Sequence, residues 1–355
     1  MGKITLGEVA IESKATWKSD KVGVPIVGLE HLEPGEITLS NWEIDSENTF
    51  TKKFSKGQVL LGRRRVYLRK AVIAPVDGIC SGDITVIEAI PGKILPELLP
   101  FVIQNDKFFD YAVQGSAGSL SPRVKWEHLK KYSFELPSID EQKILANKLW
   151  AAYRLKESYK KLLSATDEMV KSQFIEMFGD LDTNVKCYPI TTVEKVALNL
   201  FAGGDKPDDI SSDITDKYTY PVWANGEGER GLMGYAKTYR VDKEALTISA
   251  RGTIGYCAIR EPYFTPIVRL ITLVPNETVD IVYLKYFFDQ TGFESTGAVQ
   301  GQLTIPTIKL KKVLLPPIEE QKKFTGVVKQ ADKSKFELSK SIEAIDAVIK
   351  SLING

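Results

Sequence analysis

The chain repeats part of itself, and this repeat constrains the fold more than any other feature of the sequence. The segment Leu136-Pro-Ser-Ile-Asp-Glu-Gln-Lys143 returns as Leu315-Pro-Pro-Ile-Glu-Glu-Gln-Lys322, an offset of 179 residues. The match continues without gaps, and 13 of 38 positions are identical between 136–173 and 315–352. A period this long is far beyond that of a solenoid repeat. The pattern therefore predicts that the chain of 355 residues is a duplicated two-part unit.

Each repeated segment has the pattern of a long helix. A capping box of Ser138 with Glu141 opens the first helix, and Pro317 stands where the second begins. Gly179 and Gly355 follow the two helices as C-terminal glycines. One such helix cannot bury its apolar stripe alone, so we expect the two to pair in an intramolecular coiled coil. The predicted seam consists of Leu145, Leu149, Ala152, Leu155, Tyr159, Leu162, Thr166, Met169 and Gln173 in the first helix and Phe324, Val328, Ala331, Ser334, Leu338, Ser341, Ile345, Val348 and Leu352 in the second.

Two larger segments precede the helices, and both carry the short β-branched and aromatic runs of mixed α/β domains. We predict an α+β fold with two such domains separated by two long helices. The predicted bounds are 1–135 for the first domain, 136–179 for the first helix, 180–314 for the second domain and 315–355 for the second helix. Faint similarity links the domains: 6–10 with 193–197, 59–73 with 246–259, and 99–103 with 284–288. Two diverged copies are expected to bind two different targets of one kind.

This layout resembles the specificity subunits of type I restriction–modification systems. The two Leu-Pro-x-Ile-(Asp/Glu)-Glu-Gln-Lys segments, 136–143 and 315–322, carry the resemblance. In that family a glycine-rich turn, an apolar residue and a basic stretch precede each segment. Here these are Gly118-Ser119-Leu120 with Lys130-Lys131, and Gly301-Gln302-Leu303 with Lys311-Lys312. On this alignment Ser121-Pro122-Arg123 lengthens the first turn relative to the second.

The resemblance implies two target-recognition domains held apart by a pair of antiparallel helices. Each domain would read one half of a bipartite, asymmetric site on double-stranded DNA, and the helices would set the spacer between the halves. The implied partners are two modification (methyltransferase) subunits, which carry the methyl-donor pocket, and motor–nuclease restriction subunits. Pseudo-two-fold symmetry within one chain suits two opposed half-sites on a duplex.

The first domain contains a stretch, 52–70, with eight basic residues and no acidic one. Such a run suits phosphate contacts and bidentate reading of guanine, although Lys and Arg also protect exposed strand edges. In the second domain Arg251 aligns with the Arg63–Arg65 run, while Asn225 and Gln302 have side chains that can read adenine or hold a turn. The candidate DNA-binding residues are Lys52, Lys53, Lys56, Arg63, Arg64, Arg65, Arg69 and Lys70 in the first domain and Lys206, Asn225, Arg230, Lys237, Arg240 and Arg251 in the second.

Sequence signatures of an enzyme are few, and each has a structural explanation. The Asn-Pro-Pro-aromatic motif of an amino-methyltransferase is absent, and His31 and His128 lack metal-ligand spacing. The segment 226–231 has the spacing of a dinucleotide loop, but no helix pattern follows it, so we expect a turn. A nuclease-like Glu-x-Lys occurs at 141–143 and at 320–322, where helix capping explains the glutamates. We therefore expect a non-catalytic protein without cofactor or metal.

Composition suggests a location and leaves two rival functions open. No apolar run is long enough to cross a bilayer, the first residues lack the core of a secretory signal, and three widely spaced cysteines suit a reducing cytoplasm. The formal net charge of +1 does not decide for or against nucleic acid. One rival is a duplicated coiled-coil adaptor that does not read DNA, against which the basic run argues. The other is a self-sufficient nuclease or methyltransferase, against which the missing motifs argue.

Overall fold

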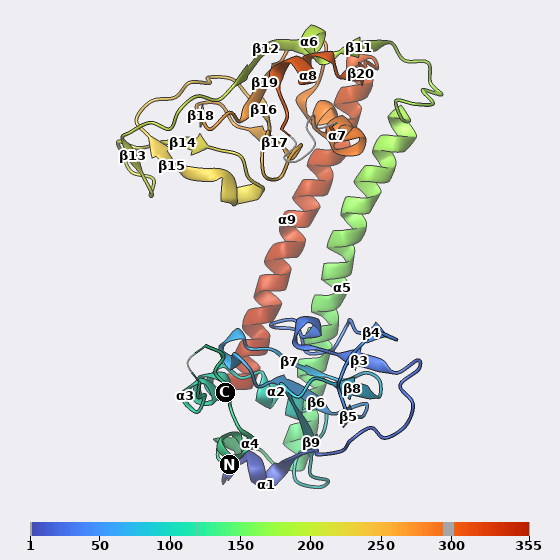
Figure 1. The fold of residues 1–355 in the computed structure, drawn as a ribbon, viewed down its shortest axis with the longest axis vertical. Coiled ribbons are helices and arrows are strands. Elements are labelled where there is room, and N and C mark those ends of the chain that lie inside the picture. The colour runs from blue at the N-terminus through green and yellow to red at the C-terminus, as the bar shows by residue number, and fades with distance from the viewer. Residues whose placement is uncertain (1, 119, 294–301, 355) are drawn as a thin grey trace. The chain divides into compact units, whose positions relative to one another are not determined.

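The computed structural model describes residues 2–118, 120–293 and 302–354 and divides the chain into two compact units (Figure 1). Unit 1 comprises residues 1–161 and 338–355, and unit 2 comprises residues 162–337. Each unit therefore contains one globular part and a portion of both long helices. Within the described residues, no helix is both long enough and apolar enough to cross a membrane.

Unit 1 is built on two four-stranded sheets and a two-stranded ribbon. Its central sheet has the strand order β2-β9-β6-β7 and is antiparallel throughout. The second sheet, β4-β3-β8-β5, contains one parallel pair, β3 with β8, and the ribbon joins β1 to β10. The strands are β1 (Gly2–Thr5), β2 (Ala10–Glu12), β3 (Pro25–Val27), β4 (Glu43–Ile44), β5 (Lys52–Phe54), β6 (Val59–Gly62), β7 (Ala71–Ile73), β8 (Gly78–Cys80), β9 (Ile84–Ala89) and β10 (Ser133–Leu136). The helices are α1 (Leu6–Val9), α2 (Leu99–Ile103), α3 (Asp106–Gln114) and α4 (Trp126–Leu129), with 3-10 turns η1 (Leu29–His31) and η2 (Val66–Leu68).

Unit 2 repeats this plan. Its central sheet is β12-β19-β16-β17, its ribbon joins β11 to β20, and its second sheet, β13-β15-β14-β18, again contains one parallel pair, β14 with β18. The second sheets differ at one edge, because β5 pairs with β8 in unit 1 whereas β13 pairs with β15 in unit 2. The strands are β11 (Ile190–Thr192), β12 (Ala197–Ala202), β13 (Ile210–Ser211), β14 (Tyr220–Trp223), β15 (Leu232–Ala236), β16 (Ala245–Ile248), β17 (Cys257–Arg260), β18 (Thr265–Pro266), β19 (Ile271–Pro275) and β20 (Lys312–Leu314). The helices are α6 (Val193–Val196), α7 (Ile281–Thr291) and α8 (Ile305–Leu310), with the 3-10 turn η3 (Gly228–Gly231).

The duplication inferred from sequence is therefore present in the fold. The similar stretches form α1 and α6, then β6-β7 and β16-β17, then α2 and α7. The segment 226–231 forms the expected turn, because η3 leads into strand β15 rather than into a long helix. The predicted fold class, two mixed α/β domains and two long helices, is confirmed.

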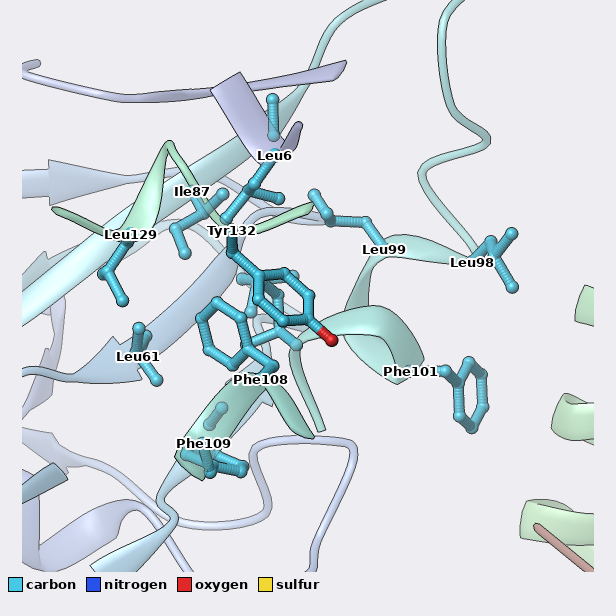
Figure 2. Close-up of a cluster of buried hydrophobic side chains, with 14 of the residues drawn as sticks. Leu6, Leu61, Ile87, Leu98, Leu99, Phe101, Phe108, Phe109, Leu129 and Tyr132 are labelled. Carbon is cyan, nitrogen blue, oxygen red and sulfur yellow. The ribbon is translucent and has the colours of Figure 1, made fainter. Parts of the chain in front are cut away.

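Each unit has its own apolar core, and the long helices contribute to both. In unit 1 side chains from the central sheet, α2 and α3 meet around Leu61, Phe108 and Tyr132 (Figure 2). The rings of Phe108 and Tyr132 pack edge to face with centroids 5.2 Å apart. In unit 2 Phe178, at the end of α5, packs edge to face on Phe324 of α9, with centroids 5.7 Å apart. Buried aromatic side chains of this size dominate the stability of such cores.

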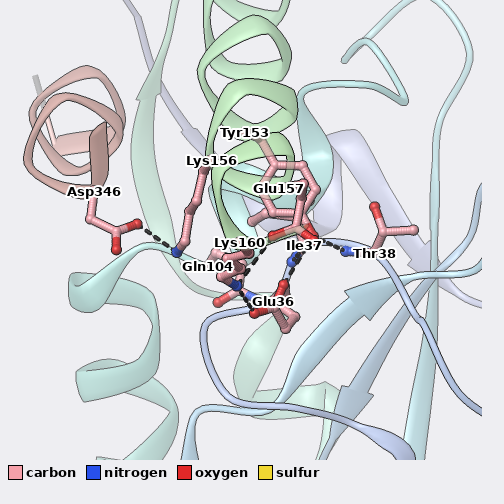
Figure 3. Close-up of polar contacts among 9 residues, drawn as sticks. All are labelled: Glu36, Ile37, Thr38, Gln104, Tyr153, Lys156, Glu157, Lys160 and Asp346. Carbon is pink, nitrogen blue, oxygen red and sulfur yellow. Dashed lines mark hydrogen bonds and ion pairs between the residues drawn. The ribbon is translucent and has the colours of Figure 1, made fainter. Parts of the chain in front are cut away.

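The long helices α5 (Ile139–Phe178) and α9 (Ile318–Asn354) run antiparallel within unit 1. Lys156 Nζ of α5 lies 2.6 Å from Asp346 Oδ1 of α9 (Figure 3). Earlier on α5 and later on α9, Leu145 and Leu352 border one cavity. Residue numbers therefore increase along α5 in the direction in which they decrease along α9, so the two helices are antiparallel in unit 1.

The same ion pair occurs a second time, in unit 2. Lys335 Nζ lies 3.0 Å from Asp167 Oδ1. Lys335 is Lys156 shifted by 179 residues, and Asp346 is Asp167 shifted by the same amount. The identities in the repeat therefore include both partners of a helix–helix contact that occurs once in each unit.

The predicted coiled-coil seam is correct only in part. Leu149 is buried as expected, but Leu155, Leu162 and Met169 are 45%, 50% and 50% exposed. In unit 1 the helix packs on the globular part as well as on α9, and the Tyr153 hydroxyl accepts hydrogen bonds from the backbone N–H groups of residues 37 and 38. In unit 1 the buried positions still step by four and three residues, but they lie on a face shifted from the predicted stripe. The most buried positions of α5 are Gln142, Ala146, Leu149, Tyr153, Lys156, Val170, Phe174 and Phe178.

The glutamine of the repeated motif anchors the start of each long helix to its unit. Gln142 and Gln321 are 1% and 0% exposed. Gln142 Oε1 accepts a hydrogen bond from the Leu95 N–H at 3.0 Å, and its Nε2 donates to the Pro137 carbonyl at 3.0 Å. Gln321 makes the same pair of backbone contacts, to Asp280 just before α7 and to the first proline of its own motif, at 2.8 Å each. The repeat preserves this glutamine because in each copy it attaches the start of a long helix to its unit through the same two hydrogen bonds.

The helix ends agree with the sequence except at one glutamate. The capping box of Ser138 with Glu141 is present, and Gly179 follows α5 with a φ of 71°. The expectation that capping also explains Glu320 is wrong, because a proline takes the place of the serine. Glu320 instead accepts a hydrogen bond of 2.6 Å from the Tyr188 hydroxyl. Burial, together with this bond, raises the pKa of Tyr188 to about 12.

Candidate nucleic-acid interface

The Arg63–Arg65 run lies in the loop after β6, where it pairs with the turn that precedes α4. Residues 63–65 and 122–124 are joined by two backbone hydrogen bonds of 3.0 and 2.8 Å. Arg64 and Arg123 stand directly opposite each other in this short antiparallel bridge. Directly opposed residues project to the same side of an antiparallel pair, so the two guanidinium groups share one face.

Asp83 is the carboxylate that these arginines surround. Arg123 donates from Nε to Oδ1 over 2.6 Å and from Nη2 to Oδ2 over 3.1 Å. Arg64 Nη1 lies 3.6 Å from Oδ2. The hydrogen bond from Arg123 holds the pKa of the Asp83 carboxyl below its usual range, so the group stays ionised at neutral pH.

The cluster carries more positive charge than its carboxylate can balance. Arg63, Arg64 and Arg123 all act on Asp83, and the next residue, Arg65, is exposed with a φ of 52°, which is unusual for a residue with a side chain. In the described part of the chain, the buried Nε atoms of Arg63 and Arg64 have no hydrogen-bond partner. Like charges placed opposite each other cost stability, and local costs of this kind are typical of functional sites. Chemically, the cluster can bind phosphate oxygens or the acceptor edge of a base.

Unit 2 has the same loop in the same place with different side chains. The Leu303 N–H donates to the Ala250 carbonyl over 3.1 Å, as residue 124 does to residue 63 in unit 1. Arg251 follows Ala250 and donates from Nη2 to Gln302 Oε1 over 3.2 Å. Asn225 holds this loop, because its amide bonds two backbone groups at 2.7 Å each. One arginine and one amide thus replace the opposed arginines of unit 1.

Comparison with known proteins finds similarity to one family. A model of the type I restriction modification DNA specificity domain matches residues 199–346. A type I specificity subunit of Mycoplasma pneumoniae is 34% identical over 134 residues, which cover 38% of this chain and 40% of that protein. A second specificity subunit from the same organism is 25% identical over 207 residues, covering 58% and 57%. Over these stretches the chain is similar to type I specificity subunits.

A solved member of the type I specificity-subunit family extends the likeness to both units. The S subunit of a type I restriction–modification system from M. genitalium has a TM-score of 0.59 at 15% identity, covering 99% of this chain and 94% of that one. At this identity the likeness concerns the fold, and it includes residues 1–161 of unit 1, which the family model does not match. The chain spans about half the length of the two curated specificity subunits that it matches.

The structure does not gather the whole basic run, 52–70, in one place. Lys52 lies 3.7 Å from a glutamate of β2, and Arg69 lies 2.5 and 2.8 Å from two aspartates of α3. Lys70 donates to a backbone carbonyl over 2.8 Å. Lys53 lies over a tryptophan ring, 5.7 Å from its centroid, and Lys56 is exposed. Within 52–70 only Arg63 and Arg64 act on Asp83, with Arg65 next to them in the loop. DNA contact by all eight basic residues of 52–70 stays a prediction.

The remaining candidates in unit 2 are separate surface residues. Lys206, Arg230 and Arg240 are exposed. Lys237 is paired with Asp209 over 2.6 Å. DNA contact by these four also stays a prediction.

Sequence reasoning missed Arg123 and Asp83. Arg123 carried a signal, because the offset of 179 aligns it with Gln302, which already stood among the candidate base readers. Asp83 carried none that we recognise. It lies in the turn between β8 and β9, and only the pairing of β9 with β6 brings it to the arginines.

The turn before α4 corrects the alignment of the two copies. Leu120 was paired with Leu303, but Leu120 is 89% exposed and Leu303 is 2% exposed. Val124 is fully buried and makes the backbone hydrogen bond that Leu303 makes in unit 2. The expected lengthening at 121–123 is therefore wrong, since the offset of 179 holds through this turn. The predictions for Ser119, Gly301 and Gly355 fall outside the described residues.

Proposed function

We propose that this chain is the DNA-reading subunit of a type I restriction–modification complex. Each unit reads one half of a bipartite, asymmetric site on double-stranded DNA. The observation that carries the proposal is the loop after β6 and its counterpart after β16. One place in a duplicated fold presents three arginines around a carboxylate in unit 1 and an arginine–glutamine pair in unit 2. Two readers of the same construction but different chemistry suit an asymmetric site.

The two loops suit DNA by charge and by hydrogen-bonding geometry. An excess of guanidinium groups attracts the phosphate backbone without regard to sequence. Arginine can also hold the O6 and N7 acceptors of guanine at once, and glutamine can hold the edge of adenine. We expect the first half-site to depend more strongly on ionic contacts than the second, because its loop holds more arginines.

The proposal assigns the chemistry to partner subunits. Two modification subunits would dock on the helices and supply the methyl-donor pocket, one for each half of the pseudo-two-fold chain. Motor–nuclease restriction subunits would join the complex for cleavage. We place this assembly in the cytoplasm. The purified chain alone should therefore neither methylate nor cut DNA.

Alanine substitution of Arg63, Arg64 and Arg65 together tests the proposal. In the complex with modification subunits we expect DNA affinity to fall by at least about 10-fold, since one bidentate base contact is worth roughly 1–3 kcal/mol. Methylation mapping should show relaxed preference in one half-site only. The matched control replaces three exposed lysines of the same unit, Lys14, Lys18 and Lys93, and should retain the motif. Unchanged affinity and an unchanged motif in the arginine variant would refute DNA reading by this loop, and turnover by the chain alone would refute its non-catalytic role.

A further inference from the structure

One position in each unit stands out because the fold repeats it while the residue changes its chemistry. Arg123 and Gln302 are equivalent by the 179-residue offset and by the hydrogen bond of the residue that follows each. Each faces an arginine of the loop after the equivalent strand, Arg64 in unit 1 and Arg251 in unit 2. Each side chain is also held by a neighbour, Asp83 in unit 1 and Arg251 in unit 2.

The way Arg123 is held leaves one edge of its guanidinium available. Asp83 takes the Nε hydrogen and one Nη2 hydrogen. A guanidinium has five N–H donors in a fixed plane, so the edge between Nη1 and Nη2 still presents two parallel donors. That edge fits the O6 and N7 acceptors of guanine. A phosphate fits the same edge less well here, because Asp83 places a negative charge beside it.

The way Gln302 is held also leaves a usable pair of groups. Arg251 donates to Oε1 over 3.2 Å, which orients the amide. Oε1 keeps a second lone pair, and Nε2 keeps its hydrogens. One acceptor beside one donor matches N6 and N7 of adenine. Replacement of a cation by a neutral amide is expected of a base-reading position and not of a phosphate-binding one.

We propose that position 123 in unit 1 and position 302 in unit 2 are the specificity-determining positions of the two half-sites. Arg123 reads a guanine and is positioned by Asp83. Gln302 reads an adenine and is positioned by Arg251. This inference rests on the proposed function, because it names the bases that the proposed DNA interface recognises.

The test is methylation mapping of the complex with modification subunits carrying Arg123→Gln or Gln302→Arg. We expect Arg123→Gln to remove the preference for guanine at one base pair of one half-site, a loss of roughly 5- to 150-fold in discrimination. The other half-site should be unchanged. Gln302→Arg should alter one base pair of the opposite half-site and leave the first intact. Lys93→Gln removes an exposed charge four residues beyond the end of β9, away from Asp83 at its start, and should leave the motif as it is.

Asp83→Asn separates base reading from phosphate binding, and it keeps the shape of the side chain. If Arg123 reads a base, the loss of its positioning partner relaxes the preference at the same base pair as Arg123→Gln. Tighter DNA binding by Asp83→Asn with an unchanged motif would mean that Arg123 contacts a phosphate. Weaker binding by Arg123→Gln to all sequences, with an unchanged motif, would mean the same. Either result would overturn the inference. The proposed function would still stand if the wild-type complex methylates DNA in a sequence-specific way. A wild-type complex without sequence-dependent methylation would refute the proposed function and the inference together.

Discussion

At the scale of single residues, Gln142 and Gln321 explain why the repeat survives where it does. Each is buried and joins the start of a long helix to its unit through two backbone hydrogen bonds. Gln142→Leu would leave the Leu95 N–H and the Pro137 carbonyl unpaired in a buried site, at a cost of about 1–3 kcal/mol. We expect amide hydrogen exchange over the first turns of α5 to accelerate by roughly 5- to 150-fold. Asn147→Leu, exposed five residues further on, is the control and should exchange as wild type; equal protection in both variants would contradict the anchoring role.

Residue identity could be predicted from the sequence more readily than residue role. The repeat marked Gln142, but only the fold shows what its amide bonds. The basic run marked Arg63, Arg64 and Arg65, yet it also included Lys52, Arg69 and Lys70, which the fold uses for internal contacts. The charge pattern of a sequence does not reveal which basic side chains lie next to an acidic residue. That residue can come from a distant part of the chain that strand pairing brings close, as Asp83 does.

At the scale of elements, the two Lys–Asp pairs between α5 and α9 allow a comparison within one molecule. In the unit 1 pair the side chains of Lys156 and Asp346 are 11% and 43% exposed. In the unit 2 pair those of Lys335 and Asp167 are 27% and 55% exposed. Water screens the second pair more, so we expect double-mutant cycles with alanine to give a coupling of about 1 kcal/mol or more for the first and below about 1 kcal/mol for the second.

The coupling energy of each Lys–Asp pair can be measured by amide hydrogen exchange in the helices that carry the pair. A reciprocal exchange of the two charges, Lys156→Asp with Asp346→Lys, should restore much of the protection that either single change removes. Lys148→Asp, an exposed change on α5, is the control. Additive effects of the two single changes at 156 and 346 would show that this contact does not hold the helices.

Helices and their capping were predictable because they depend on local sequence, whereas the buried face of α5 was not. A heptad stripe predicts a seam only when another helix is the sole partner. Here α5 also packs on a globular part, so Leu155, Leu162 and Met169 are left about half exposed while Tyr153 and Phe174 are buried. The duplicated strand order was likewise beyond the sequence, because short strands of diverged copies keep few identities.

At the scale of the whole molecule, we expect the long helices to set the length of the DNA spacer. On α5 the residues of the two ion pairs are Lys156 and Asp167, and on α9 they are Lys335 and Asp346, eleven positions apart in each case. Seven residues inserted after Lys156 and after Lys335 would lengthen both stretches by about 10 Å and keep the helix face. At roughly 3.4 Å per base pair this is about three base pairs.

The preferred spacer should therefore lengthen by about two to four base pairs, while both half-site sequences stay the same. Three pairs also rotate the second half-site by about 100°, part of which DNA twisting can absorb. An insertion in α5 alone is the control, because it puts the two helices out of register and should abolish activity. If the doubly lengthened variant still methylates with the original spacer, the helices are scaffold and do not measure the gap.

The central claim is that two diverged units of one chain read two different half-sites, and genome-wide methylation mapping of the host, with and without this gene, tests it most directly. We predict a methylated motif made of two unlike halves separated by a constant gap, present with the gene and lost without it. A single uninterrupted motif that depends on this gene, or a methylation pattern that does not change when the gene is removed, would contradict the claim.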